Sequence, residues 1–314
     1  MNHAPHIAVV GSFAVGLTMK VDRFPARGET VLGTGYRVDH GGKGSNQAVG
    51  CARLGARVRF VARVGQDAFG EMALRLYHDE GVDAAWVRLS PDVPTGVGFI
   101  LVQPESGENC IVLDPGANHL LTAQTVAESD AALADAQVVL TQLETPAEAA
   151  EEALARGRAH GVITILNPAP ARPLAASVLA TVDVLTPNQT EAKVLLGHHP
   201  QAEIPPAALA RQLLDRGARQ VVLTLGGEGA LIVSASQEIL VPAISVPVVD
   251  TTGAGDAFNA GLAVALANGA DLESAVRFGV VAGGLAVTKE GVIPSLPRRE
   301  EALDALSRYA SARR

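Results

Sequence analysis

The sequence predicts an α/β fold in which helices flank a central, mostly parallel β-sheet and a small second sheet forms a lid. Three observations support this. From about residue 120 onward, buried-strand patterns alternate with amphipathic helical patterns, which is typical of βαβ units. Two earlier stretches lack a helical period but contain short extended segments. The chain has 314 residues, 48% hydrophobic and 18% charged, so it is long and apolar enough for one large domain.

The alternating region supplies most of the predicted elements. Strands are expected at residues 138–144, 162–167, 183–188 and 221–225, and helices at residues 145–161 and 205–217. Thr145 and Pro146 are helix start signals, whereas Gly161 and Gly217 are stop signals. In the second helix, leucine and alanine recur four residues apart. Because helices join successive strands, the sheet should be mostly parallel and covered on both faces.

Residues 13–40 and 94–114 interrupt this alternation with short extended stretches separated by Gly and Pro. We interpret them as two insertions that form one small antiparallel sheet over an edge of the main domain. Such a sheet can act as a lid over a binding site. The main domain would then consist of residues 1–12, 41–93 and 115–314.

Composition narrows the possible partners and location. The net charge of −8 argues against nucleic acid or an anionic membrane as the main partner. No uninterrupted apolar run reaches the length of a membrane span, and the N-terminal segment has no signal-peptide pattern. Cys51 and Cys110 lack the C-x-x-C spacing of zinc or redox sites. We therefore expect a cytoplasmic location.

Residues 250–262, D-T-T-G-A-G-D-A-F-N-A-G-L, carry one carboxylate directly after Gly253, Ala254 and Gly255. The following residues look helical, so these three would form the turn into a helix N-terminus. Side-chain-free residues there let an anion reach unpaired N–H groups. Asp256 would stand at the rim of this anion hole, where it can take a proton from an attacking hydroxyl. The alternative is a helix cap acid after an ordinary glycine turn.

Three more stretches contain candidate binding residues. In residues 40–56, H-G-G-K-G-S-N-Q-A-V-G-C-A-R-L-G-A, glycines precede a helix whose first residues include Lys43 and Asn46. These two donors suit a polyhydroxylated ligand, or else the stretch is a solvated glycine loop. Asn188 and Glu191 lie three apart and can hold a hydrated divalent cation, or else form a capping pattern. The glycine loop at residues 224–230 ends a strand, where nucleotides bind in α/β sheets.

Two other phosphate-binding motifs are disfavoured. Residues 11–18, G-S-F-A-V-G-L-T, nearly fit a P-loop, but Leu17 stands where the lysine must be. The same stretch lacks the second glycine of G-x-G-x-x-G. A P-loop and a dinucleotide-binding oxidoreductase are therefore both unfavoured.

Together, H-G-G-K-G-S-N-Q-A and D-T-T-G-A-G-D-A-F-N-A-G resemble the two signatures of the PfkB-type carbohydrate kinases, and the resemblance covers essentially the whole chain. Within that family the chain is most similar to ribokinases, through residues 23–30, 142–146, 166–171 and 291–297. The resemblance implies a ribokinase-like fold whose β lid pairs two subunits in a homodimer. It also implies ATP-dependent phosphorylation of a sugar's primary hydroxyl, with D-ribose giving ribose 5-phosphate.

The resemblance assigns roles to individual residues. Asp256 is the general base, and the anion hole is Gly253, Ala254 and Gly255. The sugar contacts Gly42, Lys43, Asn46, Glu144 and Asp256. ATP contacts Asn188, Thr224, Leu225, Gly226, Gly227, Glu228, Gly229 and Gly255, and Glu191 helps to position Mg²⁺. A monovalent cation, K⁺, is held by Asp250, by Ser295 and by carbonyl oxygens of Thr252, Ala286, Lys289 and Gly291.

One departure concerns the sugar. Ribokinases usually follow the first strand with G-S-x-N-x-D, whose Asn and Asp bind sugar hydroxyls, but this chain has Ala14 and Gly16 there. Loss of a charge-assisted hydrogen bond lowers affinity by about 10- to 100-fold. Another furanose, a nucleoside or a sugar acid is therefore an alternative to ribose. A catalytically silent sugar-binding or regulatory protein on the same fold is a further alternative.

Overall fold

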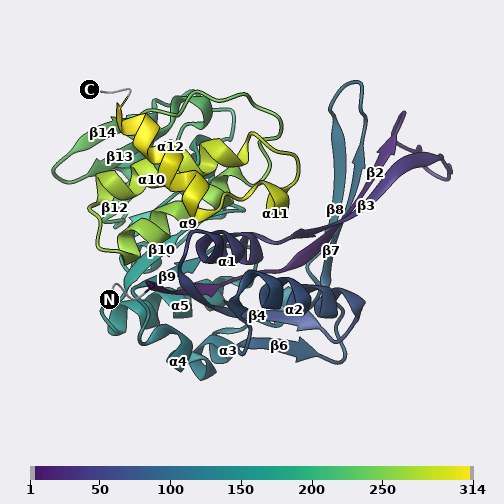
Figure 1. The fold of residues 1–314 in the computed structure, drawn as a ribbon, viewed down its shortest axis with the longest axis horizontal. Coiled ribbons are helices and arrows are strands. Elements are labelled where there is room, and N and C mark those ends of the chain that lie inside the picture. The colour runs from purple at the N-terminus through teal and green to yellow at the C-terminus, as the bar shows by residue number, and fades with distance from the viewer. Residues whose placement is uncertain (1–3, 312–314) are drawn as a thin grey trace.

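The computed structural model describes residues 4–311 and builds them around a mixed ten-stranded sheet (Figure 1). Its strands are β1 (His6–Val10), β4 (Arg57–Gly65), β5 (Val82–Asp83), β6 (Val87–Ser90), β9 (Val138–Thr141), β10 (Ile163–Leu166), β11 (Val184–Leu185), β12 (Gln220–Thr224), β13 (Ala230–Ser234) and β14 (Glu238–Val241). Their order is β14-β13-β12-β11-β10-β9-β1-β4-β5, with β6 beside β4. All neighbouring strands from β12 through β5 pair in parallel, as do β4 and β6. The pairs β12–β13 and β13–β14 are antiparallel.

Helices cover both faces of this sheet. They are α1 (Lys43–Arg53), α2 (Ala68–Glu80), α3 (Ala123–Glu128), α4 (Asp130–Leu133), α5 (Ala147–Ala159), α6 (Ala176–Leu179), α7 (Gln189–Leu196), α8 (Pro206–Asp215), α9 (Ala254–Ala267), α10 (Leu272–Ala286), α11 (Val292–Ser295) and α12 (Arg299–Ser311). Along β1, Ile7 and Val9 pack against the α1, α2, α9 and α10 side, while Ala8 and Val10 pack against the α3 to α5 side. Because side chains alternate along a strand, these residues fill two separate hydrophobic layers.

The predicted fold class is confirmed, although several predicted elements are shorter. The strand expected at residues 183–188 comprises only Val184–Leu185, since Pro187 follows almost at once and cannot donate to a ladder. The helices expected at residues 145–161 and 205–217 are confirmed as α5 and α8. No helix within residues 4–311 is both long and apolar enough to cross a bilayer.

The small sheet is separate from the main one, and its strand order is β3-β2-β7-β8. Its strands are β2 (Ala14–Val21), β3 (Gly33–Gly41), β7 (Gly96–Val102) and β8 (Asn109–Asp114). The expectation that it is antiparallel throughout is wrong, because the central strands β2 and β7 run parallel. Each insertion forms one hairpin, and the first strand of both hairpins leaves the main domain in the same direction. The sheet projects away from the main body instead of lying over its edge (Figure 1).

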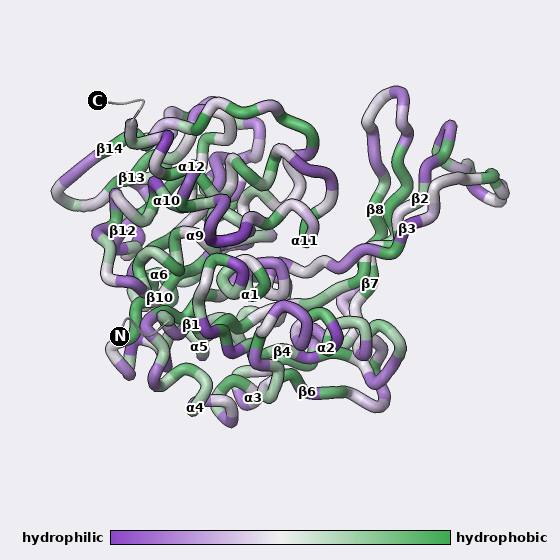
Figure 2. Tube along the Cα trace, viewed as in Figure 1, coloured by the Kyte–Doolittle hydropathy of each residue, from purple (hydrophilic) through white to green (hydrophobic). Residues whose placement is uncertain are grey.

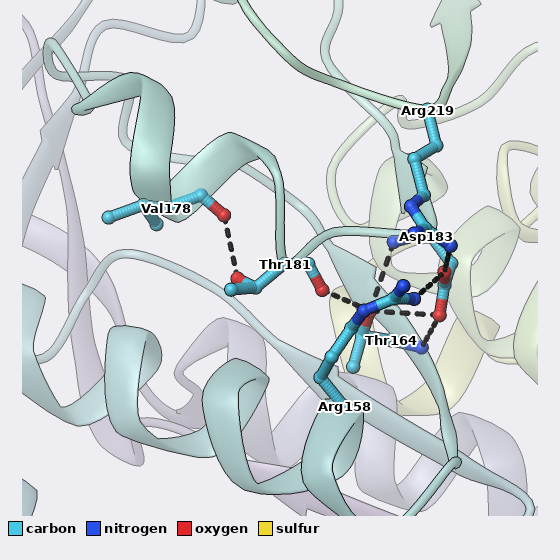
Figure 3. A network of polar contacts seen from close by, with 6 residues as sticks. All are labelled: Arg158, Thr164, Val178, Thr181, Asp183 and Arg219. Atoms are coloured by element: carbon cyan, nitrogen blue, oxygen red, sulfur yellow. Dashed lines mark hydrogen bonds and ion pairs between the residues drawn. The ribbon is translucent and has the colours of Figure 1, made fainter.

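A polar network fixes the start of the very short strand β11 (Figure 3). Asp183, just before β11, accepts hydrogen bonds from Arg158 Nη1 (3.0 Å) and Arg219 Nη1 (3.3 Å). Its other oxygen accepts from the backbone N–H of Thr164 in β10 (3.0 Å), and Thr164 Oγ1 donates to the Thr181 carbonyl (2.6 Å). These bonds lie at the amino end of the strand. The amino end of β11 is therefore anchored to β10 and to two arginines.

Candidate active site

Buried polar side chains gather where the carboxyl ends of β1, β9, β10 and β11 meet the N-termini of α1 and α9. They include Ser12, Asn46, Gln47, Gln142, Asn167, Thr186, Asp256 and Asn259. Ligands of open α/β sheets bind at this edge, outside the carboxyl ends of the strands. The sheet topology thus brings residues from distant parts of the chain to one site.

Asp256 lies in the first turn of α9, whose N-cap is Gly253. Gly253 has a φ of 81°, and a Cβ there would come within 2.6 Å of Val292 Cγ1, so glycine is required on both counts. The sequence placed Asp256 at the rim of an anion hole. There the residue is only 5% exposed, because the first turn of α9 packs against α1.

Two amides hold the Asp256 carboxylate. Asn46 Nδ2 donates to its Oδ2 (2.8 Å), and Gln47 Nε2 donates to its Oδ1 (2.9 Å). Burial raises the pKa of the Asp256 carboxyl above its usual range, while the charge of Lys43 and these two donors act in the opposite direction. A carboxylate with a raised pKa is a stronger base than a solvated one, which suits abstraction of a hydroxyl proton.

Gln47 connects this carboxylate to the strands of the main sheet. Its Nε2 also donates to Asn167 Oδ1 (3.0 Å), and its Oε1 accepts from Gln142 Nε2 (2.6 Å). Asn167 Nδ2 in turn donates to the carbonyl of Thr186 (3.2 Å). The carboxylate of Asp256 is therefore supported from β9, β10 and β11 at once.

The glycines around Lys43 let two parts of the backbone come very close together. Gly42 has a φ of 88°, and a Cβ on it would lie 2.6 Å from Phe13 Cα. A Cβ on Gly44 would lie 2.4 Å from the Ser12 nitrogen. These glycines let α1 approach the backbone that follows β1. Their close contact is therefore with the protein itself, although Gly42 also lines the cavity described below.

Lys43 stands among three carboxylates. Burial opposes its charge, but Asp256, Glu144 and Glu191 outweigh that effect and raise the pKa of Lys43 above its usual value. Glu144 is itself fixed, because its Oε2 accepts from Ser12 Oγ (2.6 Å) and from the backbone N–H of Lys43 (2.8 Å). The predicted sugar ligands Lys43, Asn46, Glu144 and Asp256 thus come together in one place.

A cavity of about 170 Å³ lies between this cluster and the small sheet. Ser12, Gly42 and Glu144 line it from the main domain, and Ala14 and Gly16 line it from β2. The two positions at which the sequence departs from the family pattern therefore do border the site. A small polyhydroxylated molecule fits a cavity with acceptors and donors on one side.

The N-terminus of α9 offers the expected anion site. The N–H of Ala254 makes one long hydrogen bond to the Thr251 carbonyl (3.3 Å). A Cβ on Gly255 would meet no atom within 4 Å, so the space beside this residue is open. The first N–H groups of a helix lack intrahelical acceptors and lie at its positive end. Residues 253–255 can therefore stabilise negative charge close to Asp256.

The predicted nucleotide residues also converge. Asn188 forms a parallel bridge with Thr224, whose N–H donates to the Pro187 carbonyl (2.9 Å). The glycine loop after β12 continues from this bridge as a single 3₁₀ turn, Gly226–Glu228. A Cβ on Gly226 or Gly227 would meet nothing within 4 Å. This loop is thus open on the side where a ligand can approach.

A model of the pfkB family carbohydrate kinases matches residues 4–299. The chain belongs to this family. It is 38% identical to a ribokinase of Haemophilus influenzae over 300 residues, which are 96% of this chain and 98% of that protein. It is 35% identical to a deoxyribokinase of Salmonella typhi, over 96% of this chain and 98% of that protein. The structure of Arabidopsis thaliana ribokinase complexed with ribose and ATP superposes with a TM-score of 0.91, at 32% identity, covering 97% of this chain and 99% of that one.

Membership of this family makes the chain a sugar kinase, and the clustered carboxylate, lysine and helix N-terminus suit phosphoryl transfer to a hydroxyl.

In this PfkB-family kinase, Asn188 and Glu191 form a capping box on α7. Asn188 Oδ1 accepts from the Glu191 N–H (2.8 Å), and Glu191 Oε2 accepts from the Asn188 N–H (2.8 Å). The capping interpretation of this pair is confirmed. Burial raises the pKa of Glu191. The charge of Lys43 lowers this pKa and that of Asp256 raises it, so the Glu191 carboxyl also faces the site.

Two chain segments predicted to hold a cation meet in this kinase. Asp250 accepts hydrogen bonds from the N–H of Thr252 (2.9 Å) and from the N–H of Gly291 (3.0 Å). Partial burial opposes its charge, but these donors keep the pKa of Asp250 below its usual value. Outside the hydrogen bonds within helices and strands, no backbone N–H of residues 4–311 donates to the carbonyl of Thr252 or to that of Lys289. Asp250 and these free carbonyls fit a monovalent cation.

Sequence reasoning missed part of this kinase's site. It did not select Gln47, Asn167 or Gln142, and it did not select Ser12. A usable signal was present for two of them, because Gln142 and Asn167 directly follow the buried strands β9 and β10, at their carboxyl ends. Such residues lie beside the ligand edge of a parallel sheet.

Proposed function

We propose that this protein transfers the γ-phosphoryl group of ATP to the primary hydroxyl of a sugar, and that D-ribose, giving ribose 5-phosphate, is such a substrate. The observation that carries the proposal is the buried Asp256 carboxylate, held by Asn46 and Gln47 at the N-terminus of α9. The names of the similar proteins support ribose as the first sugar to test.

In this mechanism Gly42, Lys43, Asn46 and Glu144 bind the sugar and direct its primary hydroxyl toward Asp256. Asp256 accepts the hydroxyl proton as the oxygen–phosphorus bond forms. The bond between the γ-phosphorus and the ADP oxygen breaks, and ADP takes the electron pair. The N–H groups of residues 253–255 stabilise the charge on the transferred group, since phosphoryl transfer depends mainly on positioning and electrostatics.

The nucleotide would bind to the open side of the glycine loop. Its contacts would be Asn188, Thr224, Leu225, Gly226, Gly227, Glu228, Gly229 and Gly255. Within residues 4–311, no three His, Cys, Asp or Glu side chains group as a metal site. Mg²⁺ is commonly bound through one or two carboxylates plus substrate phosphates and water. Glu191 fits that requirement, and Mg²⁺ would neutralise phosphate charge during transfer.

The cation site would be formed by Asp250 and Ser295 with carbonyl oxygens of Thr252, Ala286, Lys289 and Gly291. We expect Asp250→Asn to remove most of the activation by K⁺, because the charge that attracts the cation is lost. Activity of both proteins should be measured with magnesium ATP and 0 to 200 mM KCl, roughly the range over which salt also screens surface charge. Tetramethylammonium chloride at equal concentrations controls for ionic strength. Equal K⁺ activation of the two proteins would contradict this assignment.

The lid strands would pair two subunits in a homodimer. Phe99, Ile111, Val112 and Leu113 are exposed apolar side chains in β7 and β8, where Figure 2 shows hydrophobic segments in the projecting sheet. Apolar surface of this kind often marks an interface between proteins.

Since intracellular ATP would be the phosphoryl donor, a cytoplasmic location belongs to the same proposal.

A second candidate is a kinase for another furanose, a nucleoside or a sugar acid, which Ala14 and Gly16 favour because both line the cavity. A coupled ADP-release assay with magnesium ATP and K⁺ should be run with ribose, fructose, 2-keto-3-deoxygluconate and adenosine. Turnover of ribose is the expected result. Turnover of only another compound would replace ribose with that substrate. No turnover of any of them would favour the silent sugar-binding alternative.

A further inference from the structure

The lid strands β2 and β7 line the sugar cavity without offering it a polar side chain. Five of their residues border the cavity: Ala14, Val15, Gly16, Gly98 and Ile100. On the opposite side, the main domain provides Ser12 and Glu144. A hydroxyl that loses water in the cavity without gaining a partner weakens binding. An acceptor supplied by the lid would therefore contribute directly to sugar affinity.

Two polar residues that border the cavity near the lid are engaged elsewhere. Asn118 Oδ1 accepts from the Phe13 N–H (3.0 Å), and its Nδ2 donates to the Phe13 carbonyl (2.7 Å). Asp114 pairs with Val97, so its side chain leaves the sheet on the face opposite to that of Gly98. Neither residue supplies the missing acceptor on the face of the sheet that carries Gly16 and Gly98.

The neighbouring strand β3 places a carboxylate on that face. Asp39 pairs with Gly16 in antiparallel register, and Gly16 pairs with Gly98, so the three positions project to the same side. A Cβ on Gly16 would lie 4.0 Å from Asp39 Cβ. Gly41, two residues further along β3 on the same face, lines the cavity. Asp39 therefore stands at the rim of the cavity, directly beside Gly16.

Gly16 leaves room for this carboxylate. Its φ is not positive, and a Cβ there would come no closer than 3.6 Å to Ile100 Cδ1, which is an ordinary van der Waals contact. In contrast to Gly42, this position can carry a side chain without strain. The effect of glycine here is that the space beside Asp39 stays open toward the cavity.

The Asp39 carboxylate is also available to a ligand. Its side chain is 47% exposed, and its ion-pair partner within residues 4–311 is Arg37, whose Nε lies 3.5 Å from Oδ2. That separation is longer than an ordinary N–H···O hydrogen bond. Arg37 Nη1 donates instead to Glu290 Oε1 (2.5 Å). Arg37 thus compensates the charge of Asp39 while the carboxylate oxygens keep their capacity to accept hydrogen bonds.

We propose that Asp39 is a sugar-binding and specificity-determining residue, whose carboxylate accepts hydrogen bonds from ring hydroxyls of the substrate. This inference rests on the proposed sugar kinase function. An ionised carboxylate has two oxygens and can accept from two neighbouring hydroxyls. The sugar is then bound from both sides, by Lys43, Asn46 and Glu144 of the main domain and by Asp39 of the lid. Asp39 favours sugars that carry hydroxyls on the lid side, because an analogue without them leaves its carboxylate unpaired.

The test measures ribose affinity by calorimetry and kcat/KM by ADP release in Asp39→Ala and Asp39→Asn. Asp39→Ala should bind ribose about 10- to 100-fold more weakly, the effect of one hydrogen bond to a charged group, and kcat/KM should fall mainly through KM. Asp39→Asn keeps one acceptor oxygen, so its loss should be smaller. Both variants are used, after their folding is checked by thermal melting, so that misfolding of one does not end the test.

The same variants are compared on 2-deoxy-D-ribose and 3-deoxy-D-ribose. For at least one analogue the loss should be smaller than for ribose, because the hydroxyl that Asp39 binds is already missing. Asp22→Ala is the matched control. It removes an exposed acid from the same hairpin, just beyond the end of β2, and should leave binding of all three pentoses unchanged.

Unchanged ribose affinity in the folded Asp39 variants would overturn this inference while the proposed function stands. An equal loss for ribose and both analogues would overturn it as well, since that pattern indicates structural damage and not a contact with one hydroxyl. Absence of turnover of all three pentoses by the native protein would refute the proposed function itself, and the inference with it.

Discussion

Replacing Asp256 with asparagine is expected to lower kcat by about 10²- to 10⁴-fold, the usual contribution of a positioned general base. The amide keeps the shape of the side chain but cannot accept the hydroxyl proton. Sugar affinity should change little, because the proposed sugar ligands Lys43, Asn46 and Glu144 are unchanged. Steady-state kinetics would give kcat, and calorimetry with the sugar alone would give the dissociation constant.

The asparagine fits the site without leaving donors facing each other. Asn46 Oδ1 is buried and has no hydrogen-bond partner, so rotation of the Asn46 amide would let it accept from the new Nδ2. Asp271→Asn is a suitable control, since Asp271 caps the exposed start of α10 and asparagine caps equally well. The control should keep full activity. If Asp256→Asn retained activity within about tenfold of the native protein, the base assignment would be wrong.

The sequence was sufficient for the parts of the site that are continuous along the chain. Asp256 follows its anion turn within four residues, and Asn188 precedes the first turn of α7, so local spacing alone predicted both neighbourhoods. The alternation of strands and helices predicted the main sheet for the same reason. The signal for each of these features is local in the sequence, although the pairing of strands such as β1 with β9 is not.

The remaining features depend on long-range contacts. Gln47 meets Gln142 and Asn167 across 95 and 120 residues, and nothing in the local pattern around Gln47 specifies those partners. The parallel pairing of β2 with β7 depends on the direction in which two hairpins leave the main domain. The glycines beside Lys43 illustrate the same limit. A glycine pattern indicates close approach to something, but only the fold shows that the backbone of Ser12 and Phe13 is what they approach.

These long-range contacts give Gln47 a positioning role that acts through Asp256. Gln47→Leu removes the donor to Asp256 Oδ1, and a lost donor to a carboxylate raises its pKa. Asp256 must be deprotonated to act as a base, so activity is lost as the pH falls through its pKa. The acid limb of the kcat/KM profile should therefore move to higher pH. At neutral pH, kcat/KM should fall by about 10- to 100-fold, the effect of one hydrogen bond to a charged group.

The direction of that pH shift separates positioning from simple structural damage. Leucine also leaves Asn167 Oδ1 and Gln142 Nε2 without a partner, so a lower melting temperature is expected as well. A damaged protein would lose activity at all pH values, whereas a raised pKa of Asp256 moves the acid limb specifically. Gln124→Leu, at an exposed glutamine on α3 that donates to Glu128, should leave both the limb and the rate unchanged. An acid limb that stays in place in Gln47→Leu would show that Gln47 supports the fold without tuning the base.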